Sequence, residues 1–565
     1  MTKTSRLNYA LLATVAVAGL LPIHPASAQT DTRLQSIEQQ IQALKTQLGQ
    51  VRAKVAARDQ ALKAAQQQAQ TAQDQANAAA AQAASIATAA QAASIATAPP
   101  VAAPAPTAPA QPPLGQGQIR VGGLTVTLGG FAAMEGFDRP RNEATGILTA
   151  FNSIPFANSP NYRTPEFRML SEASRASALT EGWIDDHQKL TAYAELDFFS
   201  AGTSSNSNQS NSYTIRPRQV WGAYENTDWG LHVVAGQTWS LATMYRIGLI
   251  PRQEDVPLTI DAQYVVGFDF ARQAALRVTK DFDDHKLWAG LALEEPQTLF
   301  SPTAGPNCTT GANAAAYANG AIPESTTCGG SNVNSLTAYS NNNAPDIIAK
   351  LAADPGWGHY EVYGLLRFLD ANQALATGVG STHSQVTTGE GIGAGMILPL
   401  VSKKLEFQAS GLYGKAVGRY GTSQLPDATF NPDGKLEPLT EYSVMGGFVA
   451  HPIPTLDIYA YGGAEGADQK SYGGTYGYGA PDANLSGCYQ TLGTCNAVTS
   501  AIVEGTVGAW YRPIRSAYGT VQVGLQYVYV ERNAFQGVGA TPGSKLSPST
   551  NENGLFFSFR YYPFQ

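Results

Sequence analysis

The sequence is poor in charge and has no long apolar run after its first residues. Only 14% of its 565 residues are charged, whereas soluble domains average about a quarter. The formal net charge of −7 has the wrong sign for a nucleic-acid-binding protein. No later run is long and apolar enough to form a transmembrane helix. We therefore expect neither a nucleic-acid partner nor a helical membrane domain.

Enzymatic motifs are also missing. The chain contains no nucleophile elbow, no HExxH motif and no phosphate-binding loop. The stretch GEGIGAG, residues 389–395, has the glycines of a nucleotide loop. It lies in a segment with β-strand patterning, so we interpret these glycines as strand residues. The sequence predicts no enzyme, no cofactor and no metal site.

The N-terminus is typical of a secretory signal. Lys3 and Arg6 supply positive charge, Ala10–Pro22 is an apolar stretch, and Ala26 to Ala28 form a small-residue cleavage site. The alternative is an anchor helix, but the apolar stretch is shorter than the ~20 residues that a membrane-spanning helix needs. We predict a signal peptide over 1–28 and export of the mature chain.

Cysteine is scarce, with four in the chain. Cys308 and Cys328 are close in sequence, as are Cys488 and Cys495, and each pair lies in a polar stretch rich in Gly and Asn. A metal site would want tighter spacing and histidine partners. Because the protein is expected to be exported, two local disulfides are the better interpretation. We predict the bonds Cys308–Cys328 and Cys488–Cys495.

A heptad pattern follows the signal peptide. Apolar residues recur in steps of three and four from Leu34 to Leu62, interrupted by Arg58, and alanines continue the pattern to Ala79. This repeat predicts an α-helical coiled coil over 29–98, whose mixed seam does not fix two strands over three. Seven prolines within Pro99–Pro113 predict a stiff linker over 99–117.

From about Leu124 the hydrophobic pattern changes to period two. In TVQVGLQYVYV, residues 520–530, Val, Leu and Tyr alternate with Thr, Gln and Gly, and KLTAYAELDFF at 189–199 repeats the scheme. Alternation of this kind indicates β-strands with one apolar face. A soluble sandwich also alternates, but these strands run ~9 residues or more, which is enough to cross a bilayer when tilted.

Short and long connections alternate along the same region. The short, turn-like ones are WIDDHQ at 183, ENTDWG at 225, DFDDHK at 281, DPGW at 354, VSKK at 401, HPIPT at 451 and RPIRS at 512. Long polar stretches lie between them, as in outer-membrane barrels, which have short periplasmic turns and long external loops. Aromatic residues gather beside the short turns and resemble an interfacial girdle: Trp183, Trp229, Trp288, Trp357, Trp510, Tyr511 and Tyr518.

These patterns predict an all-β transmembrane antiparallel barrel of about 16 strands over 118–565, preceded by the coiled coil in the periplasm. The chain ends in GLFFSFRYYPFQ, which has the alternation of a last strand. Leu555, Phe557, Phe559 and Tyr561 would face lipid, whereas Ser558 and Arg560 would face the lumen. Such a strand would close the barrel against the first one and remove the sheet edge.

Charged residues expected on inward faces are the candidate functional residues. The third long loop, Trp239–Gln263, mixes apolar anchors with charge, which predicts a loop folded into the barrel. A charged constriction sorts solutes by size and sign. The alternative is that the arginines only pair with acids to satisfy the barrel wall. The predicted constriction comprises Arg175, Glu195, Asp197, Arg216, Arg218, Arg246, Arg252, Glu254, Asp255 and Arg277.

The chain resembles the DcaP-like trimeric porins of Gram-negative outer membranes. The local matches are ELDFFS (195–200), RPRQVWGAY (216–224), AGQTWS (235–240) and FARQ (270–273), which cover the first third of the barrel. The resemblance implies a homotrimer, passive uptake of small and often anionic solutes, and an inward third loop. It also implies basic lumen residues, and these match Arg175, Arg216, Arg218 and Arg277 by position.

The sequence thus predicts an outer-membrane porin with a water-filled channel for passive diffusion of small hydrophilic solutes, with a preference for anions. Outer-membrane lipid and lipopolysaccharide would surround it. One alternative is a phosphate-type anion-selective porin, although such porins carry more arginines and lysines in the pore. Another is a tether, in which the coiled coil reaches the cell wall and the barrel serves only as an anchor.

Overall fold

The structure is a computed structural model of the chain. It describes residues 113–200, 213–301, 321–324, 326–329, 334–375, 383–432, 434–473 and 477–565, together with Gln42, Lys45 and Gly49. The chain divides into two compact units, Met1–Gln111 and Pro112–Gln565. The predicted signal peptide, coiled coil and most of the linker lie outside the described residues, apart from those three isolated helical positions.

In the described part of the second unit, sixteen antiparallel strands form a closed barrel, as predicted. They are β2 Leu124–Arg139, β4 Arg175–Trp183, β5 Gln188–Ser200, β6 Thr214–Asn226, β7 Leu231–Trp239, β8 Arg272–Phe282, β9 Leu287–Glu294, β13 Asp346–Ala353, β14 His359–Leu375, β15 His383–Val401, β16 Leu405–Lys415, β19 Thr440–Ile453, β20 Leu456–Ala467, β23 Thr499–Ser516, β24 Gly519–Ala534 and β27 Ser549–Tyr562. Each strand pairs with the next, so backbone groups inside the sheet are satisfied without water.

Shorter elements decorate the barrel. The short strands are β1 Gln118–Val121, β3 Glu166–Leu170, β10 Ala321–Glu324, β11 Thr326–Gly329, β12 Asn334–Ser340, β17 Ala428–Phe430, β18 Leu436–Pro438, β21 Lys470–Ser471, β22 Gly477–Tyr478, β25 Gly537–Val538 and β26 Lys545–Leu546. The 3-10 helices are η1 Phe151–Ser153, η2 Pro160–Arg163 and η3 Gly418–Tyr420. No helix among the described residues has both the length and the hydrophobicity to span a membrane.

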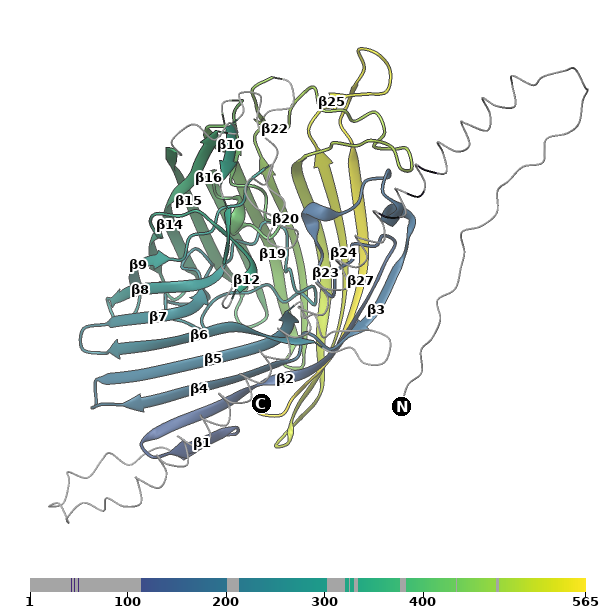
Figure 1. Ribbon diagram of the computed structural model, residues 1–565. Helices are drawn as coiled ribbons and strands as arrows, with labels where there is room; N and C mark the ends of the chain where they lie inside the picture. The colour runs from purple at the N-terminus through teal and green to yellow at the C-terminus, as the bar shows by residue number, and fades with distance from the viewer. Residues whose placement is uncertain are drawn as a thin grey trace, which may run out of the picture. The chain divides into compact units, whose positions relative to one another are not determined.

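The C-terminal strand closes the barrel. β27 pairs with β24 on one side and with β2 on the other, and Figure 1 shows yellow β27 beside blue β2. Gly136 of β2 lies opposite Phe557, and a Cβ at Gly136 would come within 2.2 Å of the Phe557 ring. The prediction that the aromatic C-terminus is the closing strand is confirmed.

The connections between strands are short at one end of the barrel and mostly long at the other. The short ones are 184–187, 227–230, 283–286, 354–358, 402–404, 454–455 and 517–518. Six of them coincide with predicted turns. The prediction was wrong for RPIRS at 512–516, because this segment continues β23 in pairing with β24 and the turn follows it. Because the strand number is even, the barrel unit begins and ends at the short-turn end. The Gln116 Nε2 donates to the Ala517 carbonyl there, at 3.1 Å.

Side chains alternate between an apolar outer surface and a polar inner one. In β24 Leu525 is 56% exposed, while its neighbour Gln526 is 1% exposed. In β5 Leu190 is exposed, whereas Glu195 and Asp197 are buried. An apolar exterior around a polar interior is the arrangement of a barrel that sits in lipid.

The aromatic girdle is only partly as predicted. Trp183, Trp229, Trp357, Tyr511 and Tyr518 are exposed beside the short turns. The assignment was wrong for Trp288 and Trp510, which are buried inside the barrel. Adjacent strand residues point to opposite faces, so Trp510 cannot share the outer face with Tyr511.

The predicted bond between Cys488 and Cys495 is present, with a Cα–Cα distance of 4.6 Å. It lies in the long connection between β20 and β23. The other predicted pair falls outside the described residues, because Cys308 is not described and only the backbone of Cys328 is.

Candidate functional site: an arginine-walled lumen

The connection between β7 and β8 folds into the barrel, and we call residues 240–271 the inward loop. Leu241, Tyr245 and Leu249 are fully buried in one apolar cluster with strand residues of β9, β13 and β14. The sequence predicted this from the apolar anchors in 239–263, and their burial confirms it. Ile247 is the exception, since it is 53% exposed.

Polar side chains of the wall hold the backbone of the inward loop. The Leu241 N–H donates to Glu294 Oε1 at 2.7 Å, and the Tyr245 N–H donates to Glu361 Oε2 at 3.1 Å. Further along, Val266 and Gly267 donate to Glu504 and Glu465, each at 2.7 Å. These carboxylates act as acceptors for the loop, so their charge is directed at the loop backbone.

Two glycines allow the loop to touch the wall. Gly267 has φ +89°, and a Cβ there would lie 2.0 Å from the Val444 carbonyl oxygen. A Cβ at Gly463 of β20 would lie 1.8 Å from the Val266 carbonyl oxygen. The close backbone approach therefore depends on the absence of side chains at both positions.

A cavity of about 520 Å³ lies between the inward loop and the opposite wall. Seven arginines line it: Arg175, Arg216, Arg218, Arg252, Arg272, Arg512 and Arg560. Five acids line it as well: Glu135, Glu195, Glu254, Asp261 and Asp457. Formal positive charge therefore exceeds formal negative charge in the lining.

An ion-pair cluster on β4, β5 and β6 brings together five of the predicted residues. Arg218 Nε lies 2.6 Å from Glu195 Oε1, and Arg218 Nη1 lies 2.9 Å from Asp197 Oδ2. Arg216 Nη2 lies 2.8 Å from Asp197 Oδ2, and Arg175 Nη1 lies 3.5 Å from Glu195 Oε2. Three guanidinium groups share two carboxylates, so the cluster pairs its acids completely and keeps an excess of positive charge.

Aromatic rings hold the arginines in place. The Arg560 guanidinium lies 4.8 Å from the Phe131 ring centroid and 4.6 Å from that of Trp510. The Arg272 guanidinium lies 4.9 Å from the Trp239 ring centroid and 5.8 Å from that of Phe270. Guanidinium groups stack favourably on aromatic faces. The rings fix the planes of the arginines toward the cavity.

Four predicted residues do not line this cavity: Asp197, which lies in the ion-pair cluster, and Arg246, Asp255 and Arg277. Arg246 Nη2 pairs with Asp255 Oδ1 at 2.5 Å and with Glu406 Oε1 at 3.0 Å. Arg277 is 1% exposed and bonds the Tyr245 hydroxyl. These contacts attach the loop to the wall, whereas Arg252 and Glu254 are on the cavity side.

Several lining residues were absent from the predicted set, among them Arg272, Arg512 and Arg560. Arg560 was expected on the inner face of the last strand, and Arg272 lies within the FARQ match. In the sequence, these arginines alternate with apolar residues that face outward, and this alternation could have predicted that they point into the lumen. Their convergence with β4 and β6 depends on barrel closure, which no local pattern contains.

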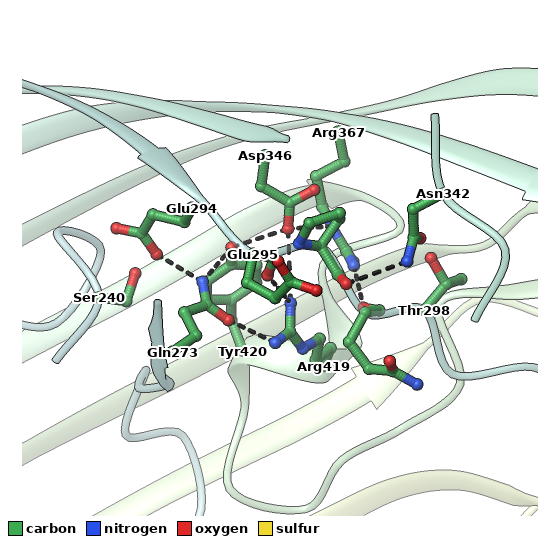
Figure 2. Close-up of polar contacts among 12 residues, drawn as sticks. Ser240, Gln273, Glu294, Glu295, Thr298, Asn342, Asp346, Arg367, Arg419 and Tyr420 are labelled. Atoms are coloured by element: carbon green, nitrogen blue, oxygen red, sulfur yellow. Dashed lines mark hydrogen bonds and ion pairs between the residues drawn. The ribbon is translucent and has the colours of Figure 1, made fainter. Parts of the chain in front are cut away.

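At the long-loop end a polar network fixes a further arginine. Arg367 Nε donates to Asp346 Oδ2 at 3.1 Å and Arg367 Nη1 to Asp427 Oδ1 at 2.6 Å. Figure 2 shows Arg419 in the same network, directed at Gln273 and at the Glu295 backbone. Arg419, Arg216 and Arg272 line a smaller cavity of about 240 Å³.

Arginines also line a cavity at the short-turn end of the barrel. Arg512 and Arg515 line a cavity of about 330 Å³ together with Gln522 and Gln565. Arg512 also lines the central cavity and bonds Asp457. Arginines thus follow one another from Arg419 at the long-loop end to Arg515 at the short-turn end.

No protein-family model and no curated protein matches the chain. Solved structures do match. The outer membrane channel DcaP of Acinetobacter baumannii aligns with a TM-score of 0.52 and 15% identity, covering 79% of this chain and 100% of that chain. The chain has the fold of the DcaP channel. The resemblance drawn from the sequence motifs is confirmed at the level of the fold.

Two further matches are more distant. The outer membrane protein OmpT of Vibrio cholerae has a TM-score of 0.41 and 9% identity, covering 79% of this chain and 99% of that one. An anion-selective porin from Comamonas acidovorans has a TM-score of 0.41 and 10% identity, covering 78% and 99%.

Proposed function

We propose that the protein is an outer-membrane porin, a water-filled channel for passive diffusion of small hydrophilic solutes with a preference for anions. One observation carries the proposal: a continuous series of arginines lines cavities from Arg419 to Arg515 along the lumen. Charge on the wall of a narrow pore selects solutes of opposite sign. The fold shared with the DcaP channel supports the same function.

The excess of positive charge in the lumen needs an explanation, because the whole chain has a net charge of −7. Glu294, Glu361, Glu465 and Glu504 accept hydrogen bonds from the inward loop. Arg218 of β6 and Arg560 of β27 line the central cavity. The inward loop therefore covers much of the acidic wall and leaves the basic wall in contact with solute.

The remaining partners follow from this function. The exposed apolar strand faces would contact outer-membrane lipid and lipopolysaccharide, and a homotrimer would cover part of them. The chain enters the barrel at the short-turn end, which in an outer-membrane barrel faces the periplasm. This placement supports a periplasmic N-terminal segment.

The phosphate-type alternative is less well supported. Such porins concentrate lysine as well as arginine in the pore. Among the described residues that line the central cavity, the basic ones are all arginine. No described feature favours the tether over a channel.

Reconstitution in planar bilayers tests the proposal. The full chain is expected to give stepwise conductance increments, and a membrane that stays sealed would contradict a channel. A variant lacking 29–98 tests the tether: unchanged conductance together with lost association with the cell wall would assign that role to the N-terminal segment.

A further inference from the structure

One carboxylate on the inward loop, that of Glu254, faces the arginine wall and forms no ion pair with any residue that the structure describes. Glu254 lines the central cavity beside Arg252. Its Oε1 atom is buried and has no hydrogen-bond partner among the described residues. A carboxylate in this position contributes negative charge directly to the solute path.

The loop holds Glu254 rigidly. Residues 245 and 254 form an antiparallel β-bridge. On either side of it, the Arg246 N–H donates to the Gln253 carbonyl and the Asp255 N–H donates to the Met244 carbonyl, both at 2.7 Å. Lys350 Nζ donates to the Thr243 carbonyl at 2.8 Å and so attaches this hairpin to β13. Glu254 therefore stays at the cavity when its charge changes.

We propose that Glu254 is a specificity-determining counter-charge of the channel, whose protonation strengthens the preference for anions. This inference rests on the proposed function. With Glu254 ionised, its charge offsets part of the arginine wall. With Glu254 protonated, the wall acts on the solute undiminished, so one proton changes the ion selectivity.

The charged surroundings of Glu254 set the range in which this occurs. Burial raises the pKa of Glu254 to about 7, whereas Arg277 of β8 lowers it and Glu195 of β5 raises it. Tyr245 and Arg252 flank it on the loop itself, and Arg175 and Arg218 line the same cavity from β4 and β6. Glu254 is thus ionised well above pH 7 and neutral well below it.

Reversal potentials of the full chain in a KCl gradient, recorded from pH 8.5 to pH 5.5, test the inference. The anion-to-cation permeability ratio is expected to rise about twofold to threefold on acidification, which is the effect of one unit charge several ångströms away in water. The variant E254Q is expected to have the higher ratio at every pH. The matched control D283N removes an exposed carboxylate from a short turn and is expected to behave like the wild type.

The possible failures are distinguishable. A conducting wild type whose ratio stays constant with pH, or an E254Q channel whose ratio changes as much as that of the wild type, would overturn the role of Glu254 and leave the porin intact. Absence of conductance at every pH would overturn the proposed function and this inference together. Heat-dependent migration of the folded barrel in gels verifies that E254Q and D283N are folded.

Discussion

Arg218 and Glu195 face each other across β6 and β5, with Arg218 Nε 2.6 Å from Glu195 Oε1. Arg218 also reaches Asp197 at 2.9 Å. The guanidinium fork can satisfy two carboxylates at once, which a lysine ammonium cannot do with the same geometry. This one residue therefore both pairs the acids of the wall and supplies charge to the cavity.

Replacing Arg218 by Gln is expected to reduce the anion-to-cation permeability ratio about twofold, because it removes one lumen charge. It is also expected to destabilise the barrel by about 3 kcal/mol, since Glu195 and Asp197 lose a buried partner. Reversal potentials and denaturant unfolding in detergent measure the two effects. R168Q, which changes an arginine on β3 that does not line the cavity, is the control. Equal selectivity in R218Q and R168Q would contradict the account.

Gly267→Ala is expected to release part of the inward loop. The new Cβ would meet the Val444 carbonyl oxygen at 2.0 Å, at a residue with φ +89°. A side chain in that region costs about 1–2 kcal/mol before the clash is counted. We expect lower stability and a larger single-channel conductance. In Gly364→Ala the added Cβ meets no atom within 4 Å, so this control should conduct like the wild type. Wild-type conductance in G267A would show that the loop contact does not narrow the channel.

Asp269 makes the stability of the loop depend on pH. Burial raises its pKa from the ordinary range of an aspartate to about 8, while its carboxylate accepts from the Ser443 and Tyr363 hydroxyls. The folded state retains a proton that the unfolded state loses near pH 4, so the stabilisation falls as pH rises from about 4 to about 8. Asp269→Asn removes this titration. The difference between unfolding midpoints at pH 5.5 and pH 8.5 should be smaller in D269N, and an unchanged difference would contradict the assignment.

The disulfide between Cys488 and Cys495 is expected to protect a surface loop without affecting transport. Leu492 N–H donates to the Asn158 carbonyl at 2.8 Å, and Asn158 Nδ2 donates to the Gly493 carbonyl at 3.1 Å. The bond closes a short loop. Because it restricts the conformations of the unfolded chain, it is expected to stabilise the folded state by about 2 kcal/mol. The double variant C488S/C495S should be cut faster by protease in this loop at unchanged conductance. A change in ion selectivity would imply that the loop reaches the solute path.

The barrel could be predicted from the sequence because its evidence is local. Period-two alternation, short turns and the aromatic last strand each lie within a few residues, and they gave the strand number and the closure of β27 on β2. The apolar anchors Leu241 and Leu249 likewise predicted that the loop folds into the barrel. These features concern which face of an element avoids water, and sequence periodicity records that directly.

The composition of the site was less predictable. Arg246 and Arg252 are six residues apart on one loop, yet Arg246 pairs with the wall while Arg252 lines the cavity. Arg272, Arg512 and Arg560 come from strands far apart in sequence and meet only after the barrel has closed. Which side of the loop a residue takes depends on tertiary contacts such as Glu406 and Glu361, and no periodicity encodes these.

The reversal potential of the full chain in a planar bilayer, with KCl in a tenfold gradient at pH 6, tests the central claim most directly. An arginine-lined lumen predicts a potential of the sign produced by chloride flux exceeding potassium flux. A potential of the opposite sign would contradict the claim that the basic wall controls passage through the channel.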